Sequence, residues 1–305
     1  MRVLVTGGTG FLGSYLVEDL IVHGHDVAVL ARPDSDRRRL SAVRDRVQFL
    51  GGTLEDLPAL RPAATEFRPD AVAHLAWQGV AGVDRNAPLQ AHNIVRTVDL
   101  AALAAEVGAK VFVGAGSQAE YGSYPRAVRE DDETRPTTLY GKAKLAAAAM
   151  AGQIAVQAGM RFAWLRVFST YGPKDHEHWL IPDMIRKLRA GQRMKLTRCE
   201  QLWGFLHARD AAAAFRIVLE TPSAAGIFNL GSADAPPLKD TVTLLRSLLA
   251  STAELGFGEI AYQPDQVMIL QADIARLQAL GWNPAIDLPT GLRETVAWYD
   301  GTQQS

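Results

Sequence analysis

The 305-residue chain has a single cysteine, Cys199, and no excess of charge of either sign. One thiol forms no internal disulfide, so we expect a reducing, cytoplasmic setting. The 32 lysines and arginines against 33 aspartates and glutamates give a net charge of −1. This balance argues against nucleic acid or an anionic membrane surface as a partner. The sequence also lacks an apolar run long enough to span a bilayer, and its first residues have the pattern of a core strand rather than of a signal peptide.

A glycine-rich loop follows directly after the first apolar run. Arg2-Val3-Leu4-Val5 leads into Thr6-Gly7-Gly8-Thr9-Gly10-Phe11-Leu12-Gly13, and apolar residues then recur at helical spacing. The glycine spacing is G-x-x-G-x-x-G. Backbone N–H groups at such a helix start point at phosphates, and the helix dipole favours their charge. Glycine lets the backbone approach the phosphates closely. The loop therefore predicts a bound dinucleotide pyrophosphate.

Short apolar runs alternate with helical patterns through the first half of the chain. The runs at 2–5, 26–30, 47–50, 71–75, 110–115 and 162–167 predict strands, and the segments at 89–107 and 139–158 predict long helices. This alternation predicts the α/β class, with a doubly wound parallel Rossmann sheet. In such sheets the ligand lies at the carboxyl ends of the strands.

The pattern changes after Tyr171-Gly172-Pro173, where helices mix with short strands and irregular links. We expect residues 1–172, rejoined by about 205–235, to form the dinucleotide-binding Rossmann domain. We expect residues 173–204 and 236–305 to form a smaller C-terminal α/β lobe that binds the substrate. A cleft between two lobes is a usual place for a small molecule.

Tyr140 and Lys144 lie four residues apart in a predicted helix and therefore on one helix face. An ammonium group there stabilises a tyrosinate and lowers the pKa of the phenol, which makes tyrosine a usable proton donor or acceptor. Ser117 follows the strand at 110–115, where its hydroxyl can hydrogen-bond a substrate carbonyl. Together with the glycine loop, these three residues predict carbonyl chemistry beside a dinucleotide.

The chain resembles the extended short-chain dehydrogenase/reductase family, in its NAD-dependent epimerase/dehydratase branch. The resemblance covers nearly the whole chain. It is carried by residues 6–13, His74-Leu75-Ala76, Asn93, 117–122, 140–144, 165–168, Tyr171-Gly172-Pro173, Phe205-Leu206-His207 with Asp210, 228–231, and Leu280-Gly281-Trp282 with Pro284. It implies that Ser117, Tyr140 and Lys144 form the catalytic triad, that Lys144 also binds the nicotinamide ribose, and that Asn93 helps to hold the cofactor-side helix.

The end of the second predicted strand bears on which nicotinamide cofactor is bound. Family members that use NAD usually place an acidic residue there for the adenosine ribose, whereas this chain has Ala31-Arg32-Pro33. A guanidinium suits a 2′-phosphate by charge and shape, so we favour NADP(H) over NAD(H); the alternative is that Asp34 or Asp36 reaches the ribose. The expected cofactor contacts are Gly7, Gly10, Phe11, Leu12, Gly13, Arg32, Leu54, Leu75, Ala76, Asn93, Tyr140, Lys144 and Phe168.

The residues after Ser117 reduce the number of reactions that the chain is expected to catalyse. Sugar-nucleotide 4,6-dehydratases of the family carry an Asp-Glu pair at the places of Gln118 and Ala119, and Glu120 is out of register by one. Members that epimerise and then reduce a keto sugar carry a cysteine at the place of Ala119. The remaining readings are an NADPH-dependent reductase of a nucleotide-linked 4-keto-6-deoxy sugar with Tyr140 as the acid, a nucleotide-sugar 4-epimerase, and a non-catalytic NADP-binding sensor or scaffold. Residues 116–122 and 201–205 also resemble CDP-abequose and CDP-paratose synthase-type reductases.

We expect Trp77, Gln118, Ser169 and Trp203 to contact the substrate. The arginine with which relatives grip the substrate diphosphate is replaced here by Trp203 or Gly204, and Arg186, Arg198 or Arg209 are the candidates to substitute for it.

No metal site is expected, because His176 and His178 have no evident third ligand. His74 is expected to be a packed structural residue. The family often dimerises through two long helices, so we expect a homodimer with a four-helix interface made by residues 89–107 and 139–158.

Overall fold

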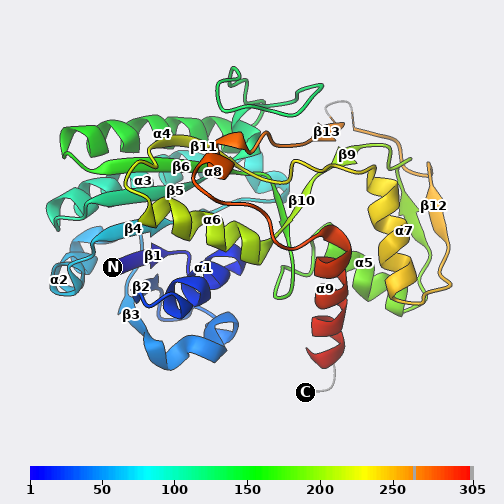
Figure 1. The fold of residues 1–305 in the computed structure, drawn as a ribbon, viewed down its shortest axis with the longest axis horizontal. Helices are drawn as coiled ribbons and strands as arrows, with labels where there is room; N and C mark the ends of the chain where they lie inside the picture. The colour runs from blue at the N-terminus through cyan, green and yellow to red at the C-terminus, as the bar shows by residue number, and fades with distance from the viewer. Residues whose placement is uncertain (264–265, 303–305) are drawn as a thin grey trace.

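A parallel sheet forms the centre of the computed structural model, which describes residues 1–263 and 266–302 (Figure 1). Within these residues the large sheet has seven strands in the order β11-β6-β5-β4-β1-β2-β3, and every neighbouring pair is parallel. The strands are β1 (Arg2–Thr6), β2 (Asp26–Ala31), β3 (Val47–Gly51), β4 (Ala71–His74), β5 (Val111–Ser117), β6 (Arg161–Val167) and β11 (Gly226–Leu230). The predicted doubly wound α/β fold is confirmed.

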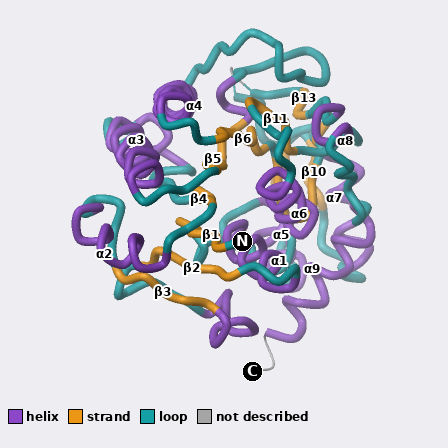
Figure 2. Tube along the Cα trace, turned by 60° about the vertical axis from the view of Figure 1, so that its left-hand side comes forward, coloured by secondary structure: helices purple, strands orange, loops and turns teal. Residues whose placement is uncertain are grey.

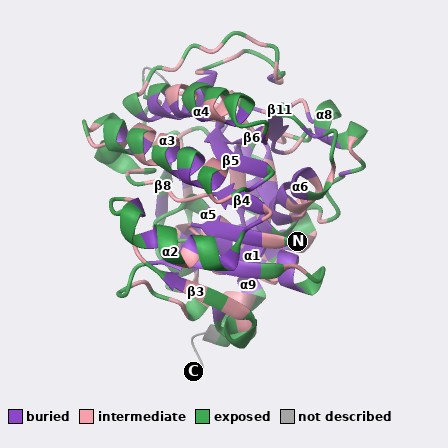
Figure 3. Cartoon of the chain, turned by 90° about the vertical axis from the view of Figure 1, so that its left-hand side faces the viewer, coloured by how far each residue is buried: buried purple, intermediate pink, exposed green. Residues whose placement is uncertain are grey.

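The sheet is covered on both faces because side chains alternate along each strand. In β1, Val3 and Val5 pack with α1 (Phe11–Val22) and α6 (Ala208–Glu220), whereas Leu4 packs with α2 (Leu57–Phe67), α3 (Gln90–Glu106) and α4 (Leu139–Gln157). Figure 2 shows these two helical layers on opposite sides of the strands. Figure 3 shows buried strands behind α2, α3 and α4, whose outer faces are exposed. The apolar runs of the sequence are therefore strands buried on both faces.

The second lobe has its own apolar core and lies beside the carboxyl end of the sheet (Figure 1). Its helices are α5 (Leu180–Arg189), α7 (Leu238–Leu248) and α9 (Leu288–Thr302), and α8 (Ala275–Ala279) packs near β11. Short parallel pairs join β7 (Ser169–Tyr171) to β10 (Phe205–His207), β8 (Met194–Leu196) to β12 (Leu255–Phe257), and β9 (Leu202–Trp203) to β13 (Ile269–Leu270). Among the described residues, no helix has the length and apolar character needed to cross a bilayer.

In the part of the chain that the structure describes, 3₁₀ segments form part of the loops beside the sheet: η1 (Arg38–Arg46), η2 (Gly82–Asn86) and η3 (Gln118–Glu120). Helix α4 begins after Thr138, whose hydroxyl accepts a hydrogen bond from Gly141 N at 3.1 Å. This cap satisfies an N-terminal amide that would otherwise lack a partner. It fixes the first turn of α4, which carries Tyr140.

Candidate active site

The glycine loop connects β1 to α1 by a turn that has no room for a side chain at Gly7 or Gly13. Gly7 has φ +74°, and a Cβ at this position would lie 2.6 Å from the backbone N of Ala76, two residues after β4. A Cβ on Gly13 would collide with the Gly7 carbonyl group. Gly10 is the N-cap of α1, and its side-chain-free turn leaves the first amides of the helix open to an anion. The cradle therefore fits a dinucleotide pyrophosphate.

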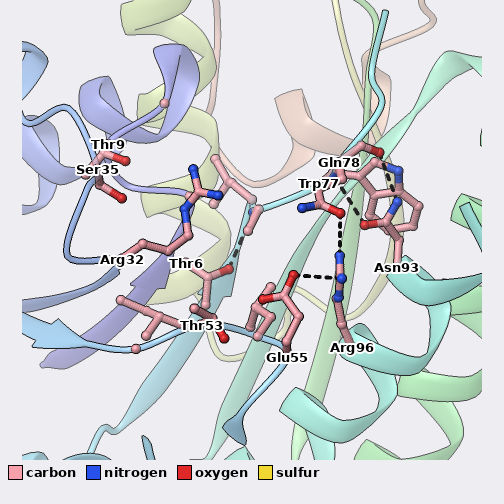
Figure 4. A pocket seen from close by; sticks show the side chains of 17 residues that line it. Thr6, Thr9, Arg32, Ser35, Thr53, Glu55, Trp77, Gln78, Asn93 and Arg96 are labelled. Atoms are coloured by element: carbon pink, nitrogen blue, oxygen red, sulfur yellow. Dashed lines mark hydrogen bonds and ion pairs between the residues drawn. The ribbon is translucent and has the colours of Figure 1, made fainter. Parts of the chain in front are cut away.

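A cavity of about 300 Å³ opens at this loop, along the carboxyl ends of β1, β2 and β4 (Figure 4). Eight of the predicted ligand contacts line it: Gly7, Gly10, Arg32, Leu54, Leu75, Ala76, Trp77 and Asn93. Sequence reasoning missed other lining residues, among them Thr9, Ser35, Thr53, Glu55, Gln78 and Arg96. The sequence gives little indication that Glu55 and Arg96 line the cavity, because the fold alone makes them neighbours.

The remaining predicted cofactor residues lie outside this lining: Phe11, Leu12, Gly13, Tyr140, Lys144 and Phe168. Phe11, Leu12 and Gly13 form the first turn of α1, behind the loop. Phe168 is buried between β6 and β7, and its ring centroid is 6.4 Å from that of Tyr121. The cofactor contacts expected of all six residues remain predictions.

Arg32 follows β2 at one end of the cavity, near Thr9 and Ser35 in Figure 4. Its side chain is 59% exposed, and its Nε lies 3.7 Å from a carboxylate oxygen of Asp34. β2 itself ends in Ala31, so the position after the strand carries a cation rather than an acid. A carboxylate does line the cavity further along, but Glu55 is paired with Arg96 at 2.7 Å.

Two buried amides of α3 hold the segment that follows β4. Asn93 Nδ2 donates to the Gln78 carbonyl at 2.9 Å, and Asn93 Oδ1 accepts from Gln78 N at 3.1 Å. Gln90 Nε2 donates to the carbonyls of Gly79 at 2.8 Å and Asp84 at 2.9 Å. The role of Gln90 was not evident in the sequence, since a lone glutamine at a helix start carries no motif.

The structure brings Ser117, Tyr140 and Lys144 together at the carboxyl end of β5. Ser117 is the last residue of β5 and caps η3, its hydroxyl accepting from Ala119 N at 3.2 Å. Tyr140 lies in the first turn of α4 and is buried. Burial raises the pKa of the Tyr140 phenol, a hydrogen bond with Ser117 and the guanidinium of Arg85 lower it, and the Glu120 carboxylate raises it.

Lys144 lies one turn further along α4 and is buried. Its Nζ donates to the Ala115 carbonyl at 2.6 Å and lies 3.7 Å from the ring centroid of Trp77. Burial lowers the pKa of this ammonium to about 7, against an opposing effect of the Glu120 carboxylate. The Trp77 ring stands edge-on to Tyr140 at 6.1 Å and donates from Nε1 to Gln90 Oε1 at 2.9 Å.

Glu120 and Arg166 form a buried ion pair next to Ser117. Glu120 Oε2 accepts from Arg166 Nε at 2.7 Å, and Glu120 Oε1 accepts from Ser117 N and Trp164 Nε1, each at 2.9 Å. Both charged side chains are at most 5% exposed. The Arg166 guanidinium also lies 4.3 Å from the ring centroid of Tyr121. Glu120, which is out of register with the dehydratase acid, therefore supports the backbone of Ser117 from within the core.

Ser169 and Trp203 meet in the second lobe, where Trp203 Nε1 donates to Ser169 Oγ at 3.0 Å. Both line an apolar cavity of about 230 Å³ with Trp179, Phe205 and Leu238, and no lysine or arginine of the described residues lines it. The fourth predicted substrate residue, Gln118, is half-buried in η3 and lines none of the cavities described above.

The candidate replacements for the missing diphosphate arginine all have carboxylate partners. Arg186 pairs with Asp183, Arg198 with Glu200 and Arg209 with Glu294. None of the three lines the apolar cavity of the second lobe.

His74 is a packed structural residue, as expected. Its Nδ1 lies 2.7 Å from Thr6 Oγ1 and its Nε2 lies 3.0 Å from Thr97 Oγ1. Burial lowers the pKa of His74 to about 3, with a smaller effect of the Lys144 charge. His176 and His178 lie in an outer loop, and the described residues contain no group of three or more His, Cys, Asp or Glu placed to hold a metal ion.

The fold and this site define an α/β protein of the Rossmann type, with a glycine cradle at a cavity and a Ser–Tyr–Lys group that packs against the cavity residue Trp77. Residues 3–231 match the model of the NAD dependent epimerase/dehydratase family, and the chain belongs to that family.

Curated relatives and solved structures agree with this assignment. A dTDP-glucose 4,6-dehydratase of Streptomyces griseus is 32% identical, over 98% of this chain and 94% of the relative. A UDP-glucose 4-epimerase of Corynebacterium glutamicum is 28% identical, over 98% of this chain and 95% of the relative. The crystal structure of the UDP-glucose 4-epimerase of Thermus thermophilus with NAD covers 99% of both chains, with a TM-score of 0.85 and 25% identity.

Proposed function

We propose that the protein is an NADPH-dependent reductase of a nucleotide-activated 4-keto-6-deoxy sugar. Two observations support this proposal: Tyr140 and Lys144 pack against Trp77, which lines the cavity at the glycine loop, and the β2 end of that cavity offers Arg32 in place of an acid. The first feature supports carbonyl chemistry and the second favours a 2′-phosphate. A nucleotide-sugar substrate is supported by the relatives, which include enzymes of dTDP-glucose and UDP-glucose.

The glycine cradle fits the cofactor, since a Cβ at Gly7 would fill the space that a pyrophosphate needs. Gly7, Gly10 and the first amides of α1 would hold the pyrophosphate, Arg32 the 2′-phosphate and Lys144 the nicotinamide ribose. When bound, the reduced nicotinamide supplies a hydride for a carbonyl carbon.

The chain's own residues handle the ketone oxygen. The Ser117 hydroxyl and the Tyr140 phenol both donate hydrogen bonds to it, which polarises the carbonyl group. As negative charge develops on that oxygen, Tyr140 transfers its proton and becomes a tyrosinate. Cations beside Tyr140 stabilise this tyrosinate, and the packing of Trp77 over Lys144 keeps water away from the ammonium.

Dehydration is not part of the proposal, although a dehydratase is among the relatives. Removal of water from the sugar needs an acid and a base beyond the tyrosine, and the two residues after Ser117 are Gln118 and Ala119. Glu120 is engaged with Arg166 in the core and is not available as a replacement.

A 4-epimerase is the second candidate, favoured by the similarity to UDP-glucose 4-epimerases over 98% of the chain. Such an enzyme oxidises and re-reduces the same carbon and therefore retains its cofactor. Tightly held NAD in the purified protein would favour the epimerase, whereas a protein that binds and releases NADP(H) would favour the reductase.

The reductase proposal is tested with a panel of nucleotide-linked 4-keto-6-deoxy sugars and NADPH or NADH, by the loss of nicotinamide absorbance. We expect turnover with NADPH, and a kcat/KM at least about tenfold lower with NADH, which is the value of one good charged contact. Arg32→Met should remove most of that preference, while Arg44→Met, on the adjacent 3₁₀ segment, should leave it intact. A preference for NADH in the unaltered protein would contradict the cofactor assignment.

We also propose a homodimer formed by α3 and α4. Val95, Met150 and Val156 on these helices are 58%, 50% and 72% exposed. Exposed apolar side chains on two neighbouring helices are typical of a protein interface. Light scattering should give twice the chain mass for the unaltered protein and the chain mass for Met150→Glu; a monomer in both cases would contradict the interface.

A further inference from the structure

Tyr140 has a second cation beside it, on an element that no motif in the sequence identified. The guanidinium carbon of Arg85, in η2, lies 4.4 Å from the ring centroid of Tyr140. Lys144 Nζ is further away, at 5.9 Å from the same centroid, and it faces the Ala115 carbonyl and the Trp77 ring. Arg85 therefore lies closer to the Tyr140 ring than Lys144 does.

The position of Arg85 is fixed from both sides by hydrogen bonds. On one side, Gln90 of α3 donates to the carbonyl of Asp84 at 2.9 Å. On the other, Asn86 Oδ1 accepts from Leu139 N at 3.0 Å, which docks η2 on the start of α4. Arg85 itself donates from Nη1 to the Val80 carbonyl at 3.1 Å. The loop is thus tied to the two helices that flank the catalytic residues.

The two cations differ in how firmly they hold their charge. A guanidinium stays protonated at any working pH, whereas a buried ammonium loses its proton readily. Lys144 is buried, and burial lowers the pKa of its ammonium from the usual 10.5 to about 7, so this group gives up its charge more readily than a guanidinium does. Arg85 is half-buried, and no ion pair to it is found within residues 1–263 and 266–302.

We propose that Arg85 is a positioning residue that supplies the permanent positive charge beside Tyr140 and stabilises its tyrosinate form. This inference rests on the proposed role of Tyr140 as the proton donor of a carbonyl reduction. The other groups that face Tyr140 are Lys144 on its own helix, the Ser117 hydroxyl at the end of β5, the Glu120 carboxylate of η3 and the uncharged Trp77 ring. Glu120 opposes tyrosinate formation, and its charge is already neutralised by Arg166.

The test is a titration of Tyr140 in the cofactor-free protein. Tyrosinate absorbance is recorded against pH for each variant with and without Tyr140→Phe, and the difference isolates this one phenol from the other tyrosines. We expect Arg85→Met to raise the midpoint by about one pH unit, the effect of one charge at this distance in a partly solvated site. Arg85→Lys should restore only a small part of the shift, because the lysine ammonium loses its own proton in the alkaline range where Tyr140 titrates.

The matched control is Arg126→Met. Arg126 also lies over a tyrosine ring, 5.5 Å from the centroid of Tyr124, and it is remote in sequence from η2. This variant should leave the Tyr140 midpoint unchanged. Circular dichroism at each pH restricts the comparison to folded protein.

Three results would overturn the proposal: the same midpoint in Arg85→Met as in the unaltered protein, an equal shift in Arg126→Met, or no ionisation of Tyr140 in any variant before unfolding. The titration requires neither cofactor nor substrate, so its outcome is independent of whether the proposed reaction occurs. In an active enzyme, the alkaline limb of kcat/KM for reduction should move to higher pH in Arg85→Met by the same amount as the titration midpoint.

Discussion

Replacing Glu120 by glutamine should destabilise the protein strongly. The change leaves the buried Arg166 guanidinium without a counter-charge. The NH₂ group of the new amide would also face an N–H donor that the Glu120 carboxylate now accepts from. Both side chains are at most 5% exposed, so water does not replace the lost partner. Breaking a buried pair by removing one partner costs about 3–5 kcal/mol, and we expect a loss of about 3 kcal/mol because the Tyr121 ring still contacts the cation.

Urea denaturation of the Glu120→Gln variant measures this loss, with the slope against urea checked for two-state behaviour. Glu133→Gln is the matched control, because Glu133 also pairs with an arginine but on the surface, with both side chains 67% exposed. Glu133→Gln should leave the urea concentration at the midpoint of unfolding unchanged. Replacing both partners, as Glu120→Gln with Arg166→Leu, should recover about half of the lost free energy. A loss below about 1 kcal/mol in Glu120→Gln would refute the view that this ion pair supports the site.

Three further predictions concern the cofactor loop, the buried histidine and the catalytic tyrosine. Gly7→Ala should weaken dinucleotide binding more than about tenfold by calorimetry, whereas Gly24→Ala, with a similar φ of +80° but nothing within 4 Å of the added Cβ, should not. The pKa of His74, about 3 in the folded protein against 6.5, means that the unfolded state binds more protons, so stability falls as pH drops below about 6.5. Between pH values of about 6 and 4, His74→Gln should lower the slope of the free energy of unfolding against pH by about 1.4 kcal/mol per pH unit, as measured by urea denaturation. Equal slopes in the variant and the unaltered protein would contradict this prediction. Tyr140→Phe should abolish turnover with unchanged cofactor affinity, and near-normal turnover would refute its role as the acid.

The strands and the grouping of Tyr140 with Lys144 were predictable from the sequence because their signals are local. Apolar runs such as Val3-Leu4-Val5 are buried on both faces of a parallel sheet, and the glycine loop combines a turn with a helix start within a few residues. Tyr140 and Lys144 share a helix face, so their spacing alone brings them together. These features need no knowledge of the tertiary fold.

The interactions that support the site were not predictable, because they join distant segments. Glu120 meets Arg166 only because β5 and β6 are neighbours in the sheet. Arg85 reaches Tyr140 from the short 3₁₀ segment η2, and the buried amides of Gln90 and Asn93 hold the chain around it. Among residues 1–263 and 266–302, no lysine or arginine lines the apolar cavity around Trp203, and this likewise depends on which side chains the second lobe places there.

The most direct test of the proposed function is the transfer of deuterium from deuterated NADPH to the sugar. The enzyme is incubated with NADPH deuterated at the transferable position of the nicotinamide and with the nucleotide-linked 4-keto-6-deoxy sugar that it consumes fastest, and the product is analysed by mass spectrometry and NMR. We predict one deuterium per product molecule, on C4, with one NADP⁺ formed for each. A product without deuterium, or a change of configuration at C4 with no net oxidation of NADPH, would contradict the reductase assignment.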